Sequence, residues 1–459
     1  MAAAIFIIAF DLYWLLKTLY LSFFLHRNWK RLKHNMTVDW RAQIATLKHE
    51  HVRHMVILPF YSEDRETIGN NILSLMRSET DLTNMIIVLA SEGRRGTEAL
   101  AIAKDIEAEY GKKFGHFLVT VHPEDVPGEM AGKGSNISFA AEKARVEILD
   151  VHHIPYEDVL VSAFDIDTVV YKHYFSCLTW HFLTTKNPYR ASYQPVPFYN
   201  NNIWDAPALS RVVAGSGTFW QMIQQERPEK NVTFSSHTIP FKTLYDVGYW
   251  QKNMVSEDSR IYWNAFFAYD GDYKTVSLSY PVSMDANLAP TFFETLKNIY
   301  KQQRRWAWGS ENVPYILFGF IKNKAIPLRT KLRISFNQIE GFWSLATNPI
   351  MIFFLGWLPV VLGGDFFNVS ILSYNLPFLT RNLMIVSMLG LILTGIIFIS
   401  FLPDKPKERS RFSKVYMALQ WILIPFTILI FGAIPGLDAQ TRLLFGKYLG
   451  FWVTPKHRK

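Results

Sequence analysis

The chain has 459 residues, which allows one large catalytic domain with membrane segments, or two to three soluble domains. Its 48 Lys and Arg outnumber 39 Asp and Glu for a net charge of +9, and many basic residues flank apolar segments, which argues against a nucleic-acid partner and favours contact with anionic lipid heads. A single cysteine, Cys177, excludes an internal disulfide and a multi-cysteine zinc site, so we expect the working domain to face the reducing cytosol.

The first apolar segment covers residues 3–25 and is long enough to cross a bilayer. Asp11 and Lys17 lie within it, which predicts packing against other helices. A signal peptide is the alternative, but the basic n-region is missing, and basic rather than small residues follow the apolar run. We therefore expect a transmembrane helix over residues 1–27, with the chain that follows it in the cytoplasm.

Residues 50–310 have the pattern of an α/β domain. Short apolar runs at 55–60, 85–90, 117–121 and 159–164 alternate with helical stretches at 71–76, 98–109 and 137–148. This alternation predicts a mostly parallel sheet that helices cover on both faces. Ligands bind such sheets at the C-terminal ends of strands, where residues 59–63, 91–94 and 165–167 fall.

Two small-residue motifs come next in this domain. Lys133 and Asn136 precede an apolar helix, where Lys133 can meet a phosphate and Asn136 a ribose or base edge; a helix N-cap with a solvated lysine is the alternative. Residues 215–218, Gly-Ser-Gly-Thr, predict a loop that either lets an acceptor approach the backbone or forms only a tight turn. Neither motif matches a P-loop, so ATP-dependent phosphoryl transfer has no support.

Asp165 and Asp167 follow a buried apolar run, so both carboxylates stand where a strand reaches the surface. Two hard oxygen donors there can hold Mg²⁺ or Mn²⁺, ions that also bind diphosphate oxygens. Such a metal would neutralise a leaving nucleotide diphosphate. A solvated turn at a strand end is the alternative, because Asp-x-Asp is common by chance.

Glu257 and Asp258 form a second acidic cluster, in a turn rich in Ser and Asp. One of these carboxylates can take the proton from an acceptor hydroxyl as it attacks. Alternatively, the pair stands at the N-terminus of a helix, where the helix dipole favours negative charge.

Gln302, Arg305 and Trp306 are spaced to share one face of a helix. Arg305 can bind pyrophosphate oxygens through two parallel hydrogen bonds, and the indole of Trp306 can offer an apolar surface to a sugar ring. An Arg and Trp pair at a membrane surface is the alternative, since an apolar segment follows.

The last third of the chain is again apolar. We expect interfacial amphipathic helices over 311–341, transmembrane helices over 342–436, and an interfacial helix with a tail over 437–459. The candidate spans are 342–363, 382–402 and 415–434. The basic loop at 403–414 should be cytoplasmic, so a full span at 415–434 would put the tail outside. Either that segment re-enters, or the stretch at 366–379 changes the count.

Asp-x-Asp, Glu-Asp and Gln-x-x-Arg-Trp, in this order and followed by apolar helices, resemble the membrane-embedded family 2 glycosyltransferases, which include cellulose and hyaluronan synthases. The resemblance covers roughly residues 50–459 and implies a GT-A-type, Rossmann-like fold with a mixed, mostly parallel sheet. It implies that Asp258 is the base, that Asp165 and Asp167 bind nucleotide and metal, and that Gln302, Arg305 and Trp306 line the acceptor and pyrophosphate site.

The resemblance extends to the nucleotide. Tyr61 and Glu63 resemble the family's first nucleotide-contacting loop, and Lys133 with Asn136 its Lys-x-x-Asn. Glu92 stands where the family usually carries an Asp pair, and it can accept a hydrogen bond from a uracil imide. Residues 451–456, Phe-Trp-Val-Thr-Pro-Lys, resemble the Phe-x-Val-Thr-x-Lys gating loop of cellulose synthases, which implies that Thr454 and Lys456 contact the diphosphate.

Together these features predict a multi-pass plasma (inner) membrane protein with a cytoplasmic catalytic domain. It would move a sugar from a UDP-sugar to a hydroxyl of a carbohydrate or lipid-linked acceptor with inversion, using Mg²⁺ or Mn²⁺, in polysaccharide synthesis with accessory export partners. One alternative is a non-processive transferase that adds one sugar to a lipid or polyprenyl phosphate. Another is a transporter or channel without catalysis.

Overall fold

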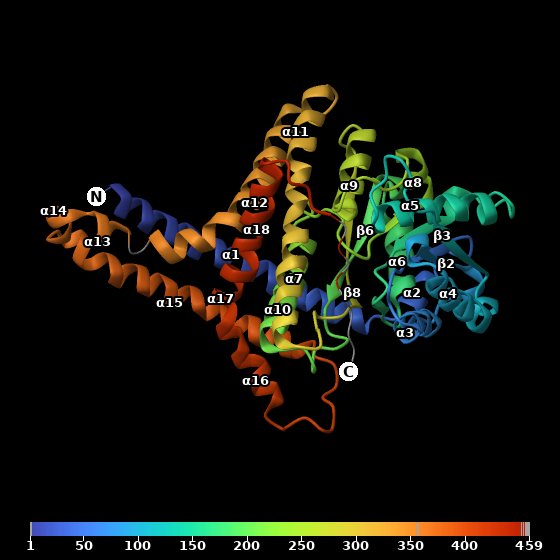
Figure 1. Ribbon diagram of the computed structural model, residues 1–459, viewed down its shortest axis with the longest axis horizontal. Coiled ribbons are helices and arrows are strands. Elements are labelled where there is room, and N and C mark those ends of the chain that lie inside the picture. Colours follow the sequence, from blue (N-terminus) through green and yellow to red (C-terminus); the bar gives the residue numbers. More distant parts are fainter. Residues whose placement is uncertain (1, 356–357, 451, 453, 455–459) are drawn as a thin grey trace.

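In the computed structural model, which describes residues 2–355, 358–450, 452 and 454, a globular α/β part lies beside an elongated group of helices (Figure 1). The strands of the globular part form one eight-stranded sheet in the order β3-β2-β1-β4-β7-β6-β8-β5. Their bounds are β1 Arg53–Pro59, β2 Met85–Glu92, β3 His116–His122, β4 Val159–Ala163, β5 Val169–Val170, β6 Ala191–Phe198, β7 Thr238–Pro240 and β8 Lys274–Ser283.

The sheet is mixed and mostly parallel. Strands β3, β2, β1 and β4 run parallel, as do β6 and β8, whereas β7 pairs antiparallel with both β4 and β6. All four apolar runs predicted as strands are strands, so the predicted α/β fold is confirmed. The apolar runs of β1, β2 and β4 are buried on both faces of the sheet, whereas the edge strand β3 is partly exposed.

Helices cover the two faces with separate cores. Val56 and Leu58 of β1 belong to one core, while Met55 and Ile57 of the same strand belong to the other. The helices of this part are α2 Trp40–Ile44, α3 Arg65–Met76, α4 Thr97–Tyr110, α5 Lys133–Ala144, α6 Tyr174–Thr184, α7 Ala208–Gln225, α8 Phe241–Val247, α9 Glu257–Ala268 and α10 Phe292–Ala307. A capping box of Thr291 and Glu294 fixes where α10 begins.

The loop predicted at residues 215–218 is wrong, because these residues lie inside α7. The glycines serve packing rather than a turn. A Cβ on Gly215 would come within 2.9 Å of Trp421 and 3.0 Å of Phe398, so only glycine lets the C-terminal helices approach α7 this closely. The small residues at 215–218 are therefore explained by the close approach of these helices and not by a turn.

The helical group combines the first described helix with the helices that follow α10. Its members are α1 Ala2–Thr37, α11 Asn312–Lys322, α12 Leu328–Leu355, α13 Leu358–Leu362, α14 Gly364–Asn368, α15 Ile371–Ser400, α16 Ser413–Leu419, α17 Ile424–Ile428 and α18 Ile434–Leu444. Helix α15 contains nearly all of the predicted span at 382–402 and most of the stretch at 366–379. Residues 356–357 of the predicted span at 342–363 lie outside the described residues.

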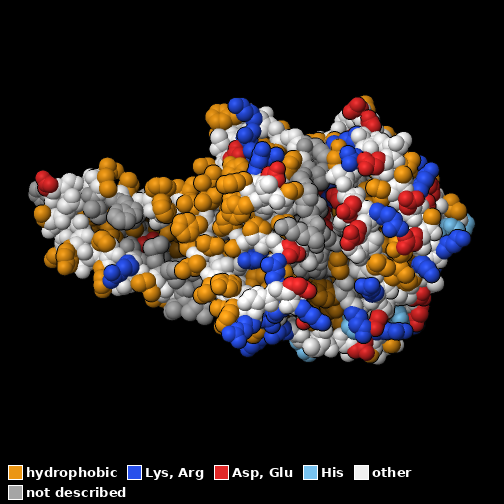
Figure 2. All heavy atoms as spheres, turned by 60° about the horizontal axis from the view of Figure 1, so that its bottom comes forward, with side chains coloured by type: hydrophobic (Ala, Val, Ile, Leu, Met, Phe, Trp, Pro, Cys, Tyr) orange, Lys and Arg blue, Asp and Glu red, His pale blue; other side chains and the backbone are white. Residues whose placement is uncertain are grey.

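Two helices of the described part, Ala4–Thr37 and Ser413–Leu444, are long and apolar enough to cross a membrane. In Figure 2 hydrophobic side chains gather over the helical group, while charged ones spread over the globular part. The prediction that the first apolar segment packs against other helices is confirmed at Lys17, whose Nζ lies 2.5 Å from Glu340 Oε1 of α12. Both side chains are about four-fifths buried, so the two opposite charges compensate each other between the helices.

Candidate active site

Three predicted site residues meet at the carboxyl edge of the sheet. Lys133 at the start of α5 donates to Asp165 Oδ1 at 2.7 Å and to the two carboxylate oxygens of Asp258 at 3.0 and 3.1 Å. Asp165 follows β4 and Asp258 opens α9, so one ammonium group joins three distant parts of the chain. About 15% of the Lys133 side chain is exposed, and the two carboxylates compensate its charge.

Asp165 and Asp167 have different surroundings. Asp165 is about one-third exposed, and its second oxygen accepts from Ser235 Oγ at 2.6 Å. Asp167 is buried, and its Oδ2 accepts from the backbone amide of Asp285 at 2.9 Å. Asn201 also joins Asp167 to Asp285, because its side-chain amide donates to the Asp167 carbonyl and to Asp285 Oδ1, both at 2.9 Å. The Asp-x-Asp motif is therefore held by the chain that follows β6 and β8.

Glu257 and Asp258 are the first two residues of α9, as the helix alternative expects. Glu257 is buried, and its Cβ lies 3.1 Å from where a Cβ on Gly134 would stand, so the glycine lets α5 and α9 meet. Burial and the charge of Asp258 raise the pKa of Glu257, while the charges of Lys133 and Arg305 oppose this shift. Of the two carboxylates, Asp258 is the one bound to Lys133.

His237 lies behind Asp258. The indole N–H of Trp250 donates to His237 Nε2 at 3.2 Å, so the proton sits on Nδ1, which donates to the Phe234 carbonyl at 2.8 Å. Burial lowers the pKa of His237, and the imidazole is neutral. Its Nδ1 is 3.7 Å from Asp258 Oδ1, so a neutral dipole rather than a second cation faces this carboxylate.

The predicted nucleotide loop lies at the ends of β1 and β2. Glu63 accepts from the backbone amides of Tyr61 at 2.7 Å and Ser62 at 3.0 Å, which fixes the loop. The Arg94 guanidinium stands 4.7 Å from the centre of the Tyr61 ring and donates to Glu92 at 2.5 Å. Burial raises the pKa of Glu92 although Arg94 opposes the shift. These side chains form one surface with an aromatic ring and a buried carboxylate.

Asn136 lies in the first turn of α5 and is buried. Its amide donates to the Ala90 carbonyl of β2 at 2.9 Å. The contact fastens the helix that carries Lys133 to the strand that carries Glu92, so the two predicted nucleotide elements are held together.

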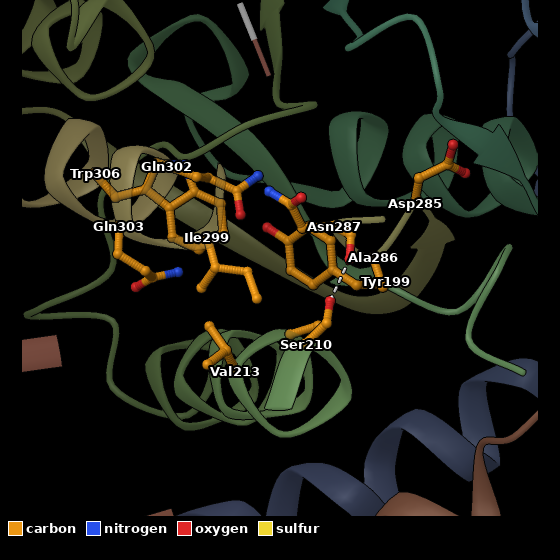
Figure 3. Close-up of a pocket in the computed structure, with 11 residues that line it drawn as sticks. Tyr199, Ser210, Val213, Asp285, Ala286, Asn287, Ile299, Gln302, Gln303 and Trp306 are labelled. Atoms are coloured by element: carbon orange, nitrogen blue, oxygen red, sulfur yellow. Dashed lines mark hydrogen bonds between the residues drawn. The ribbon is translucent and has the colours of Figure 1, made fainter. Parts of the chain in front are cut away.

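Helices α7 and α10 border a pocket of about 240 Å³, counted with its open mouth, next to the acidic residues. In Figure 3 Trp306, Gln302 and Gln303 of α10 lie across from Val213 of α7, with Tyr199 between the two helices. The remaining lining residues are Ser210, Ala214, Asp285, Ala286, Asn287 and Ile299. The structure thus brings Gln302 and Trp306 to the edge of the site near Asp285.

Trp306 is held by aromatic neighbours. Its ring centre is 5.9 Å from that of Tyr199 and 5.7 Å from that of Phe234. Burial, together with the charges of Asp165 and Asp167, raises the pKa of the Tyr199 phenol, while Arg305 opposes this effect. The predicted arginine therefore acts electrostatically on the same space as the two acidic motifs.

The neighbouring Arg304 has a different position. It donates to Asp438 Oδ2 of α18 at 2.8 Å, and Tyr300 donates to the same oxygen at 3.0 Å. Arg304 of Gln-Gln-Arg-Arg-Trp thus fastens α10 to α18.

The predicted gating tail is described only in part. Trp452 lies with its ring centre 5.2 Å from Lys301 Nζ of α10, and Thr454 is buried. Lys456 lies outside the described residues. Trp452 therefore lies near the helix that carries Gln302.

The donor set suits a hard cation that also binds a ligand. The carboxylates of Asp165, Asp167, Asp258 and Asp285 outnumber the cations of Lys133 and Arg305, so the site is net negative. Among the described residues, no three His, Cys, Asp or Glu side chains form a complete metal cage. An ion held by the Asp-x-Asp carboxylates would need further oxygens from a diphosphate, as Mg²⁺ typically takes.

Sequence reasoning missed four polar residues at this edge: Asn201, Ser235, His237 and Asp285. A signal existed for Asp285, because it follows the apolar end of β8 as Asp165 follows β4. Ser235 and His237 precede a strand of only three residues, which the sequence pattern does not reveal.

Comparisons with known proteins identify the family of the chain. A model of the glycosyl transferase family group 2 matches residues 160–434, and no curated protein matches the chain. Similar solved structures include a mannosyltransferase, PcManGT, from Pyrobaculum calidifontis in complex with GDP-Man and Mn²⁺, with 12% identity over 84% of this chain and 99% of that chain and a TM-score of 0.46.

Residues 1–349 of TarS from S. aureus share 11% identity over 86% of this chain and 93% of that chain, with a TM-score of 0.36. GalNAc-T7 with UDP, GalNAc and Mn²⁺ shares 13% identity over 63% of this chain and 56% of that chain, with a TM-score of 0.34. Because the family model spans more than half of the sequence and includes both acidic motifs and Gln-x-x-Arg-Trp, the chain belongs to the glycosyl transferase family group 2.

Proposed function

We propose that this protein transfers a sugar from a UDP-sugar to a hydroxyl acceptor by a single displacement that inverts the anomeric carbon. The observation that supports it most is the convergence of Asp165 and Asp258 on Lys133, beside a pocket bordered by Trp306. Family membership favours such an enzyme over a transporter or channel.

The donor would lie along the carboxyl edge of the sheet. Tyr61 and Glu92 would contact the base, Glu92 as an acceptor for the uracil imide, while Glu63 and Asn136 hold these elements in place. Lys133 and Arg305 supply two cations for the diphosphate. When Lys133 moves toward phosphate oxygens, it releases the carboxylate of Asp258.

Asp258 would act as the general base. Its freed carboxylate takes the proton of the acceptor hydroxyl while that oxygen bonds to the anomeric carbon, and the bond from that carbon to UDP breaks with its electron pair. Glu257 stays behind Asp258, buried and with a raised pKa, which limits the negative charge next to the base.

Mg²⁺ or Mn²⁺ is part of the proposal. Asp165 and Asp167 would hold the ion together with diphosphate oxygens. Its chemistry when bound is that of a Lewis acid that neutralises the leaving nucleotide.

The acceptor would occupy the pocket between α7 and α10. Trp306 offers the apolar surface that a sugar ring requires, and Gln302 can hydrogen-bond its hydroxyls. Thr454 and Lys456 would close over the diphosphate from the tail.

We place the protein in the inner membrane with its catalytic domain in the cytoplasm. The two helices able to cross a membrane support this topology, as do the basic residues that follow the apolar segment 3–25 within α1. In this setting the protein would take part in polysaccharide synthesis together with accessory export partners.

A panel of UDP-sugars tests the proposal. Purified protein with Mg²⁺ or Mn²⁺ should release UDP from at least one donor, and the product should carry the inverted anomeric configuration by NMR. If no donor releases UDP, the proposal that the protein is a UDP-sugar transferase is wrong. If the product retains the anomeric configuration of the donor, the proposed single displacement is wrong.

A lipid-linked acceptor is the second candidate, and one cavity favours it. Tyr199 also lines an apolar pocket whose walls are Phe198, Phe219, Phe398, Phe401 and Leu402 with Asn200, Ile203, Gly215 and Thr218. Two of these aromatic rings stand at the end of α15, close to the membrane-like helices. Product length separates the candidates, since a polymer indicates processive synthesis and a single added sugar indicates the lipid acceptor.

A further inference from the structure

We propose that Glu311 is a positioning residue that joins the C-terminal segment to the acidic turn of α9. This inference rests on the proposed function, because it assigns the segment a part in orienting Asp258. Glu311 ends the short 3₁₀-helix Trp308–Glu311, which links α10 to α11.

Both oxygens of the Glu311 carboxylate are used, and by different elements. Ser256 donates its hydroxyl to Oε1 at 2.6 Å, and Tyr448 donates its hydroxyl to Oε2 at 2.5 Å. Ser256 directly precedes Glu257 and Asp258, whereas Tyr448 lies between α18 and the tail. Hydrogen bonds to a charged acceptor are about twice as strong as neutral ones, and this carboxylate links the two elements although Tyr448 is 47% exposed.

A second layer of contacts fixes α9 to the same junction. Arg260 Nε donates to Asn312 Oδ1 at 2.6 Å, and Asn312 Nδ2 donates to Ser259 Oγ at 3.0 Å. The first turn of α9 is therefore held from the side where Glu311 and Asn312 lie. Movement of the junction would move the acidic pair with it.

The described residues before the tail pack on the junction that follows α10. Tyr448 packs edge to face on Trp308 with ring centres 5.3 Å apart, and Leu449 is buried in a cluster with Trp308 and Ala439. Trp452 lies near α10, which carries Gln302, Arg305 and Trp306. Through Glu311, the position of the C-terminal segment would therefore affect the position of Asp258.

A positioning role predicts a loss in kcat with donor affinity retained. Glu311→Gln, Tyr448→Phe and Ser256→Ala should each lower kcat about tenfold, since each removes one side of a charge-assisted link. The Kd for UDP should stay within about twofold. The effects of Tyr448→Phe and Ser256→Ala should vanish in the Glu311→Gln background, because residues that act through one group are not additive. Glu157→Gln and Tyr245→Phe, both on the exposed surface, are the matched controls.

A second measurement does not depend on turnover. Trypsin cleavage after the exposed Lys447 should be faster in Glu311→Gln and Tyr448→Phe than in the wild type and controls. Unchanged kcat in all three variants, a parallel rise in the UDP Kd, additive effects or unchanged cleavage would each overturn the inference. If the wild type turns over no UDP-sugar while cleavage still responds, the proposed function fails and the structural link stands.

Discussion

Asp165 and Asp258 bind the same ammonium group: Lys133 Nζ lies 2.7 Å from Asp165 Oδ1 and 3.0 Å from Asp258 Oδ1. One carboxylate belongs to the proposed metal and nucleotide motif, and the other is the proposed base. While Lys133 is bound to Asp258, its positive charge opposes proton uptake there. Donor binding would relieve this pairing, so the geometry implies that the donor binds before the acceptor reacts.

Lys133→Gln should weaken UDP binding about 10–100-fold and lower kcat, because a charge-assisted phosphate contact is lost and Asp165 then repels Asp258. Calorimetry with UDP measures the first effect and UDP release the second. Lys143→Gln, which removes a surface pair with Glu147, is the control. Unchanged UDP affinity would show that Lys133 does not meet the diphosphate.

EDTA should stop UDP release, and added Mn²⁺ or Mg²⁺ should restore it, because the excess of carboxylates beside the diphosphate requires a cation. The control is the same protein returned to metal after EDTA treatment, which excludes denaturation. Full turnover in EDTA would show that Asp165 and Asp167 do not bind a metal ion that the reaction requires.

Trp306→Ala should raise the acceptor KM about tenfold, since the ring forms part of the pocket wall and packs on Tyr199 and Phe234. Trp306→Phe should keep part of the affinity, and UDP binding should not change in either variant. Trp343→Ala, on an exposed position of α12, is the control. If the substitution changed only the affinity for UDP, Trp306 would be assigned to the donor site and not to the acceptor site.

His54 should make stability depend on pH. It is buried in β1 beside Phe175, and burial lowers its pKa to about 3, whereas the unfolded chain has a value of about 6.5. The unfolded state binds the extra proton between these values, so this contribution is fully present above pH 6.5 and is lost as the pH falls toward 3.

Between pH 7.5 and 5 the wild type should lose about 2 kcal/mol more stability than His54→Gln. Midpoints of thermal unfolding at both pH values measure the difference, with exposed His153→Gln as the control. Equal losses in the wild type and His54→Gln would mean that His54 is protonated in the folded protein.

The strands and covering helices could be predicted because their signals are local. Residues 85–90 form a continuous apolar run, and the structure buries all of β2. The loop predicted at 215–218 is wrong because Gly215 is required by its close contact with Trp421 and Phe398, which are far away in sequence. His237 and Asp285 were missed for the same reason: their meaning depends on Asp258 and Asp167, which only the folded chain brings near.

The role of Asp258 is tested by comparing the wild type with Asp258→Asn on the UDP-sugar that the panel identifies. We expect transfer by the variant to fall about 10²–10⁴-fold, the usual contribution of a general base, while the Kd for UDP changes little because Lys133 and Arg305 remain. Asp270→Asn, at an exposed turn, should behave like the wild type. Transfer at the wild-type rate by Asp258→Asn would contradict the central claim that Asp258 activates the acceptor.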